Sequence, residues 1–91
     1  MKLHWTSKAL SDVARLHQFL APVNPQAAAR TVQSLVSAPN QLQKHPRMGE
    51  QLEEFKPRDV RRILVGAYEM RYEILNDTVT ILRLWHTREK R

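Results

Sequence analysis

Residues 68–74 alternate strictly between apolar or aromatic side chains and polar or charged ones. Because an extended chain places successive side chains on opposite faces, this period of two predicts a strand with one face on a core and one face open. The open face should carry Glu69, Arg71 and Glu73. The chain must therefore also supply an apolar surface that covers the opposite face, which holds Tyr68, Met70, Tyr72 and Ile74.

Two further strands are predicted on either side of this one. The apolar run from Val60 to Val65 comes before it, and Gly66 permits the turn between the two. Asn76 and Asp77 predict a second hairpin turn, although the usual glycine is missing. Residues 78–86 then form the last strand, which is apolar enough to lie inside the sheet. The C-terminal part should be a three-stranded antiparallel meander.

The N-terminal half follows a helical period instead. A short strand over residues 3–6 should lead into a first helix over residues 9–20, and a second helix should begin at Pro25 with Asn24 as its cap. Pro39 should kink the second helix or start a separate last turn. The apolar stripe of the first helix contains Leu10, Val13, Ala14, Leu16, His17, Phe19, Leu20 and Ala21.

This order of elements predicts an α+β fold. An N-terminal strand is followed by a two-helix hairpin that packs on an antiparallel sheet, and the three-stranded meander completes that sheet. The segment between helices and meander should be a turn at residues 45–49 and then a loop with a short helical turn. At 91 residues there is room for one domain, and residues 1–91 are predicted to form it.

Charge and composition limit the partners and the cellular compartment that can be expected for the chain. The net charge is +6, which favours an anionic partner such as nucleic acid or an acidic protein segment, although such a charge also serves solubility alone. Cysteine is absent, so disulfides and Cys-ligated metals are excluded. No apolar run is long enough to cross a membrane and the N-terminus does not resemble a signal peptide, so we expect a cytoplasmic protein without a membrane partner.

Little in the sequence indicates cofactor chemistry. The four histidines are far apart and lack the spacing of metal ligands, so no metal site is predicted. Gly49 and Gly66 are the only glycines, which excludes a glycine-rich phosphate loop. No cofactor is expected.

The open face of the sheet is the remaining candidate site. Arg71 between two glutamates is typical of a cross-strand ladder of ion pairs. The functional alternative is an anion-binding surface, in which Arg61 or Arg62 lies across the sheet and Arg88 comes from the tail.

The last strand offers a second pair of alternatives. Leu84 and His86 should share one side of it, and Arg83 and Trp85 the other. His86 is the one plausible general acid or base, although a histidine at a strand end is also a common structural hydrogen-bond donor. Trp85 suits a core or boundary anchor better than a base-stacking platform.

Several segments, taken in order, resemble one family. Trp5-Thr6 leading into the first helix is similar to the start of the RelE/ParE toxins of bacterial type II toxin–antitoxin pairs. The alanine-rich second helix resembles theirs too. Each segment is weakly specific alone, but together they span nearly the whole chain. The other matching segments are Leu42…Pro46-Arg47-Met48-Gly49, Val60-Arg61-Arg62-Ile63-Leu64-Val65, Tyr68-Glu69-Met70-Arg71-Tyr72 and Ile81-Leu82-Arg83-Leu84-Trp85-His86-Thr87-Arg88.

The resemblance implies a toxin neutralised by a cognate antitoxin, whose flexible acidic or amphipathic segment wraps the basic domain. It also implies one of two activities. RelE-like members cleave mRNA on the ribosome with basic residues on the open face, whereas ParE-like members poison DNA gyrase. This chain has Glu69 where RNA-cleaving members have arginine, and a carboxylate there repels phosphate. The ParE-like branch is therefore favoured.

Three hypotheses follow. In the first, the chain inhibits DNA gyrase and no residue is catalytic. In the second, it is a ribosome-dependent mRNA endoribonuclease, in which Arg61, Arg71 and Arg88 bind phosphate and His86 transfers a proton. In the third, it is an inert or merely interacting protein. The residues expected to recognise the target or the antitoxin in the first hypothesis are Arg61, Arg62, Arg71, Arg83, Trp85 and Arg88.

Overall fold

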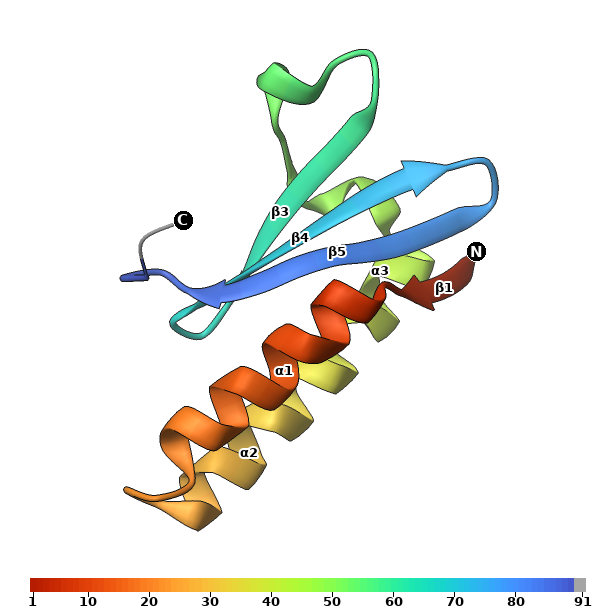
Figure 1. The fold of residues 1–91 in the computed structure, drawn as a ribbon. Helices are drawn as coiled ribbons and strands as arrows, with labels where there is room; N and C mark the ends of the chain where they lie inside the picture. The colour runs from red at the N-terminus through yellow and green to blue at the C-terminus, as the bar shows by residue number, and fades with distance from the viewer. Residues whose placement is uncertain (90–91) are drawn as a thin grey trace.

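The chain folds into a helical layer and one sheet (Figure 1). The structure is a computed structural model, and it describes residues 1–89. The elements, in chain order, are β1 (Lys2–Trp5), α1 (Ser7–Leu20), α2 (Pro25–Ser37), α3 (Pro39–Lys44), the 3-10 turn η1 (Pro46–Met48), β2 (Glu50–Gln51), the 3-10 turn η2 (Glu53–Phe55), β3 (Asp59–Val65), β4 (Tyr68–Leu75) and β5 (Thr78–His86).

The sheet has the strand order β1-β5-β4-β3-β2. Strands β3, β4 and β5 are antiparallel neighbours, which confirms the predicted meander. Strand β1, however, runs parallel to β5, so the sheet is mixed rather than antiparallel throughout as expected. A parallel pair needs a long crossover, and all the elements between β1 and β5 supply it. The predicted loop also contains β2, which pairs with β3 over two residues, too few to produce a period in the sequence.

Thr6 connects the first strand to the first helix. Its hydroxyl accepts a hydrogen bond from the Ala9 amide at 3.0 Å, which caps α1. The same hydroxyl donates to the Leu82 carbonyl at 3.0 Å, and the Thr6 amide donates to the Ile81 carbonyl at 3.1 Å. The start of α1 is therefore attached directly to β5.

The buried side of α1 differs from the predicted stripe. Ala9, Asp12 and Leu16 are buried, whereas Leu10 and Phe19 are 56% and 78% exposed. The apolar stripe of α1 is wider than the face that the sheet covers, so hydrophobicity alone did not identify that face. The buried face also includes a carboxylate, which a hydrophobic pattern cannot indicate.

The second helix begins and ends as predicted. The Asn24 side chain accepts a hydrogen bond from the Ala27 amide at 3.0 Å, and Pro25 occupies the first turn. Pro39 starts the separate helix α3, because a proline inside α2 would lack the amide needed for the next helical hydrogen bond. The alternative of a distinct last turn is thus confirmed.

The core lies between the helices and one face of the sheet. A bulge in β5 adjusts that face: Arg71 lies opposite Arg83, but Tyr72 lies opposite Ile81, so Leu82 is an extra residue. A bulge shifts the alternation of side chains, and Ile81 therefore faces the core on one side of it while residue 84 does so on the other. The central core residues are Ala9, Leu16, Leu35, Leu42, Met70, Tyr72, Ile74, Val79, Ile81 and Leu84.

The predicted turn at residues 45–49 is fastened to β4 by a buried tyrosine. The Tyr72 hydroxyl donates to the Pro46 carbonyl at 2.6 Å and accepts from the Gly49 amide at 3.0 Å. Burial raises the pKa of Tyr72. A Cβ at Gly49 would lie 2.7 Å from the Arg62 carbonyl oxygen, so only glycine allows this close approach.

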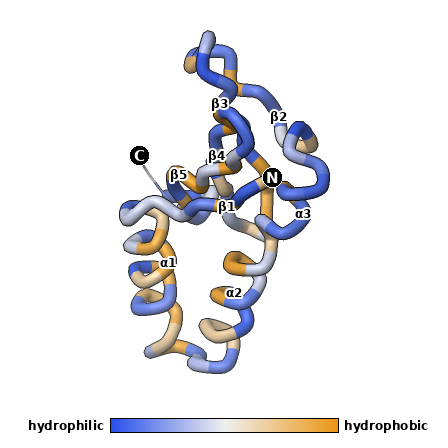
Figure 2. The backbone as a smooth tube through the Cα atoms, turned by 90° about the vertical axis from the view of Figure 1, so that its right-hand side faces the viewer, coloured by the Kyte–Doolittle hydropathy of each residue, from blue (hydrophilic) through white to orange (hydrophobic). Residues whose placement is uncertain are grey.

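The helical hairpin is longer than the sheet that it covers. In Figures 1 and 2 the end of α1 and the start of α2 project beyond the sheet, and hydrophobic and hydrophilic residues alternate along both helices. No helix within residues 1–89 is long and apolar enough to cross a membrane.

Candidate functional site

The sheet face turned away from the helices carries a row of three arginines. Arg62, Arg71 and Arg83 lie opposite one another on β3, β4 and β5. In the next row, Glu69 lies opposite Trp85. The structure thus brings together three of the predicted recognition residues, and it places Arg83 and Trp85 on the side that the sequence indicated.

A buried carboxylate lies beside two of these arginines. Glu69 is 2% exposed, and its two oxygens lie 3.4 Å from Arg62 Nη1 and 3.2 Å from Arg71 Nη2. Arg62 also donates from Nε to Glu50 at 2.7 Å. The positive charge of this part of the row is therefore neutralised within the molecule. The predicted ion pairing of Arg71 is present, but its partner Glu69 is on the same strand, and Glu69 forms its cross-strand pair with Arg62.

Aromatic side chains cover the centre of the row. The Arg71 guanidinium lies over two aromatic rings, 5.4 Å from the centre of Phe55 and 4.8 Å from the centre of Trp85, which are cation–π distances. The segment that carries Phe55 is held down by Arg58, which donates two hydrogen bonds of 2.9 Å to Glu73. This face was predicted to be open, but η2 covers part of it.

Asp12, which is not among the predicted site residues, neutralises the third arginine of the row. Its carboxylate accepts from Arg83 at 2.8 and 3.1 Å and from the Leu84 amide at 2.8 Å. Burial raises the pKa of Asp12. The hydrogen bonds from Arg83 and from the Leu84 amide lower it by more than burial raises it, so the net pKa lies below the usual value. The signal in the sequence that could have indicated Asp12 is its spacing: it lies three positions after Ala9, and residues three apart in a helix share a face.

Arg61 lies apart from this row. Successive side chains along β3 point to opposite faces, so Arg61 lies on the helix side of the sheet, where it pairs with Tyr72. Its Nε donates to Asp59 at 2.9 Å, and its Nη1 donates to the carbonyls of Arg47 and Gly49 at 3.2 and 3.0 Å. These bonds hold the turn around η1 against the end of the sheet.

His86 also lies on the helix side of the sheet. It pairs with Tyr68 across β4 and β5, and the two rings meet edge to face with their centres 5.2 Å apart. The Arg88 amide donates to His86 Nδ1 at 3.1 Å, which leaves the proton of the neutral ring on Nε2. Arg61, Arg71 and His86, three of the four residues named for the nuclease hypothesis, are therefore not gathered at one place.

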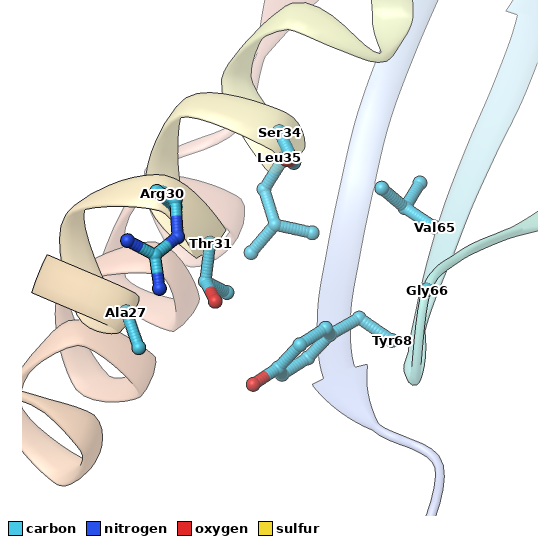
Figure 3. Close-up of a pocket in the computed structure, with 8 residues that line it drawn as sticks. All are labelled: Ala27, Arg30, Thr31, Ser34, Leu35, Val65, Gly66 and Tyr68. Atoms are coloured by element: carbon cyan, nitrogen blue, oxygen red, sulfur yellow. The ribbon is translucent and has the colours of Figure 1, made fainter. Parts of the chain in front are cut away.

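Two cavities flank Tyr68 where the hairpin projects beyond the sheet. One, of about 580 Å³, lies between the end of α1 and the end of β5, and Phe19, His86 and Arg88 line it. The other, of about 490 Å³, lies between α2 and the β3–β4 turn (Figure 3). Together they form a cleft, which we call the Tyr68 cleft.

Two of the three arginines that line this cleft differ from those of the arginine row, and the third, Arg15, forms an ion pair with Glu89. Within residues 1–89, Arg30 and Arg88 form no ion pair with a carboxylate, and each lines one of the two cavities. Arg47 shares this state near η1. The arginines that do form ion pairs are Arg15, Arg58, Arg61, Arg62, Arg71 and Arg83.

The described residues offer no metal centre. No group of three or more His, Asp or Glu side chains within residues 1–89 is placed to hold a metal ion.

Solved toxin–antitoxin structures share this fold. The chain matches a structure described as the chromosomal ParDE TA system from P. aeruginosa with a TM-score of 0.80 and 24% identity, over 94% of this chain and 95% of that one. It matches the toxin–antitoxin complex RelBE2 from Mycobacterium tuberculosis with a TM-score of 0.60 and 27% identity, over 93% and 95%. The architecture is that of the small toxins found in such pairs.

The sequence comparison identifies the family. The family described as ParE toxin of type II toxin-antitoxin system, parDE, matches residues 3–91, and the chain belongs to it. Two relatives from Caulobacter vibrioides are Toxin RelE3, 28% identical over 92% of this chain and 91% of its own, and Toxin RelE2, 29% identical over 90% of each. The chain is thus a toxin of a type II toxin–antitoxin system, which confirms the predicted family and fold.

Proposed function

We propose that this toxin inhibits DNA gyrase by binding it, without chemistry of its own, and that a cognate antitoxin neutralises it. One observation carries the proposal: His86 and the arginine row lie on opposite faces of the sheet. A general acid or base must come within hydrogen-bond reach of the proton that it transfers, and phosphate-binding groups must lie beside it. His86 and Arg71 do not meet that condition.

The charge of the row supports the same proposal. A nuclease stabilises developing negative charge with preorganised donors that have no competing anion. Here Glu69 lies within 3.4 Å of both Arg62 and Arg71, and Asp12 accepts hydrogen bonds from Nε and Nη2 of Arg83. A phosphate on this face would have to compete with carboxylates that are already bound.

The second candidate is a ribosome-dependent mRNA endoribonuclease. It is favoured by the names of the two Caulobacter relatives, RelE3 and RelE2. In this alternative Arg61, Arg71 and Arg88 bind phosphate and His86 transfers the proton. His86 and Arg88 already line one cavity, so the alternative requires Arg61 and Arg71 to be brought to them on the ribosome.

A brief induction experiment separates the two candidates. We expect intact transcripts, together with relaxed or cleaved plasmid DNA, within minutes of inducing the toxin. Cuts at defined codon positions in mRNA, with unchanged plasmid supercoiling, would reject gyrase inhibition. The His86→Ala variant should stay toxic, whereas a nuclease that depends on this imidazole would slow roughly 10²–10⁴-fold.

Purified gyrase provides the direct test. Arg88 is the arginine of the predicted recognition set that forms no ion pair with a carboxylate among residues 1–89, and we expect it to contact the target. Arg88→Ala should raise the toxin concentration needed for half-inhibition of supercoiling about tenfold, a typical loss for an important interface residue. The matched control is Arg58→Ala, because Arg58 is engaged by Glu73 and lies outside that set. Equal losses in both variants would contradict a role for Arg88.

The antitoxin should present an acidic, amphipathic segment. The exposed Phe19 beside the Tyr68 cleft offers apolar surface, and Arg30 and Arg88 offer charge that is not neutralised within residues 1–89. A segment that is disordered alone can fold onto such a surface. Coexpression of a short acidic protein encoded beside the toxin should restore growth, and failure of that protein to bind the purified toxin would reject it as the antitoxin.

A further inference from the structure

The cavity between α2 and the β3–β4 turn has polar groups on its wall and an apolar floor. Arg30, Thr31 and Ser34 line it from α2, and Tyr68 reaches it from β4. In Figure 3 the Tyr68 hydroxyl points toward α2, where Arg30 and Thr31 lie. Leu35 and Val65 supply apolar surface beside them. Guanidinium and hydroxyl donors thus face one small space of about 490 Å³.

None of these donors has a partner within the described chain. The side chains of Arg30, Thr31, Ser34 and Tyr68 form no hydrogen bond or ion pair with another residue of 1–89. No acidic residue lines the cavity. Tyr72 provides a contrast, because its hydroxyl both donates and accepts within the fold. The donors around the cavity are therefore available to a ligand.

The chemistry of these groups matches a carboxylate on an aliphatic stem. A guanidinium binds a planar carboxylate through two parallel hydrogen bonds, and hydroxyls can donate to its remaining lone pairs. Leu35 and Val65 can pack against the methylene groups. A nucleic acid backbone would need several cations along its length, whereas this cavity has one.

We propose that this cavity is a socket for one acidic side chain of the antitoxin. Its carboxylate binds Arg30 between the hydroxyls of Thr31 and Tyr68, and flanking apolar residues of the antitoxin cover the other cavity along the same tyrosine. The proposal rests on the toxin–antitoxin function proposed above, and it adds the site at which the toxin recognises a negative charge of the antitoxin.

A titration with a small carboxylate tests the socket without gyrase or antitoxin. Toxin made by cell-free synthesis and labelled on methyl groups is titrated with 4-methylpentanoate and with its uncharged amide. We expect the carboxylate to shift the methyl signals of Thr31, Leu35 and Val65, and the amide to leave them unchanged. Equal shifts by both compounds would overturn the proposal, and so would tighter binding of isobutyl phosphate, which would indicate a phosphate site.

Variants locate the effect. Arg30→Gln should weaken carboxylate binding at least tenfold, and Thr31→Val, which removes the hydroxyl at nearly constant shape, about threefold. The matched control is Arg47→Gln, because Arg47 also lacks an in-chain carboxylate partner within residues 1–89 but lies outside the cavity. Unchanged binding in the Arg30 variant would place the ligand elsewhere and overturn the socket.

Neutralisation in cells supplies the functional readout. Arg30→Gln toxin should arrest growth as the unaltered toxin does, but it should require about tenfold more antitoxin for recovery. Loss of toxicity itself would assign Arg30 to target binding and reject the proposal. If the toxin proved to be a nuclease, the titration would still report on the socket, so the two proposals can fail separately.

Discussion

The arginine row and the Tyr68 cleft differ in how far carboxylates of the same chain neutralise their arginines. On the face turned away from the helices, Arg62, Arg71 and Arg83 all lie within 3.4 Å of a carboxylate of the same chain. At the Tyr68 cleft, Arg30 and Arg88 have no such partner among residues 1–89. The number of basic residues on a surface is therefore a poor measure of the positive charge that it offers a partner.

The two tyrosines of β4 also differ in whether their polar groups are used within the fold. Tyr72 uses its hydroxyl to fasten η1 to the sheet, whereas the hydroxyl of Tyr68 makes no hydrogen bond within residues 1–89. They are four residues apart on the same strand and face. One stabilises the fold and the other borders a cleft, so residue type and strand position alone do not separate the two roles.

The largest expected effect is on the arginine row. Glu69→Ala should lower the free energy of unfolding by about 3 kcal/mol, because it leaves Arg71, whose side chain is only 22% exposed, without its carboxylate. Glu50→Ala is the matched control, since it removes the exposed partner of Arg62 and should cost about 0.5 kcal/mol or less. Urea unfolding followed by tryptophan fluorescence gives both values. Similar losses of stability in the two variants would contradict a larger contribution from the buried carboxylate of Glu69 than from the exposed one of Glu50.

Asp12 should produce the next largest effect. Asp12→Asn should cost about 2 kcal/mol at pH 7, because it weakens the hydrogen bonds to Arg83 and to the Leu84 amide. The pKa of Asp12 is lowered in the folded state, so its contribution is present above the unfolded pKa of about 3.9 and is lost as pH falls through the lower folded value.

The asparagine variant should therefore lose less stability than the unaltered toxin between pH 5 and pH 2, as measured by thermal unfolding at several values of pH. A second carboxylate keeps part of the acid dependence, because hydrogen bonding to Arg58 lowers the pKa of Glu73. Parallel curves for variant and toxin would show that Asp12 does not gain from its partners.

The smallest expected effects concern the tyrosines. Tyr72→Phe should cost about 1.5 kcal/mol, because the Gly49 amide and the Pro46 carbonyl lose their buried partner. Tyr68→Phe should change stability by less than about 0.5 kcal/mol, since no hydrogen bond is lost within residues 1–89. Chemical denaturation of the two variants side by side tests the difference, and a loss of stability at Tyr68 equal to that at Tyr72 would contradict the absence of a stabilising hydrogen bond from the Tyr68 hydroxyl within residues 1–89.

Local sequence signals were enough to predict the longer helices and strands. The alternation of residues 68–74, the Asn24-Pro25 helix start and the break at Pro39 all correspond to observed features. The bulge at Leu82 and the parallel pairing of β1 were not predictable in this way, because both depend on contacts between distant segments.

The candidate site was predictable only as a set of residues. Arg83 finds its carboxylate 71 positions away at Asp12, and Arg62 finds one 12 positions away at Glu50, so their neutralisation requires the three-dimensional register. The Tyr68 cleft depends on how far the hairpin projects beyond the sheet, which no local pattern encodes. The family resemblance indicated the partner class but not the surface.

The pairing of β1 with β5 also determines when, during synthesis, the sheet of the toxin can be completed. Residues 2–5 lie beside residues 78–81, so β1 has no strand to pair with until residues 78–81 have left the ribosome. At about 5–20 residues per second, that delay amounts to several seconds for each molecule. Contacts between such distant segments also slow folding itself. Every newly made copy therefore passes through an interval in which the sheet is incomplete and the toxin is not yet formed.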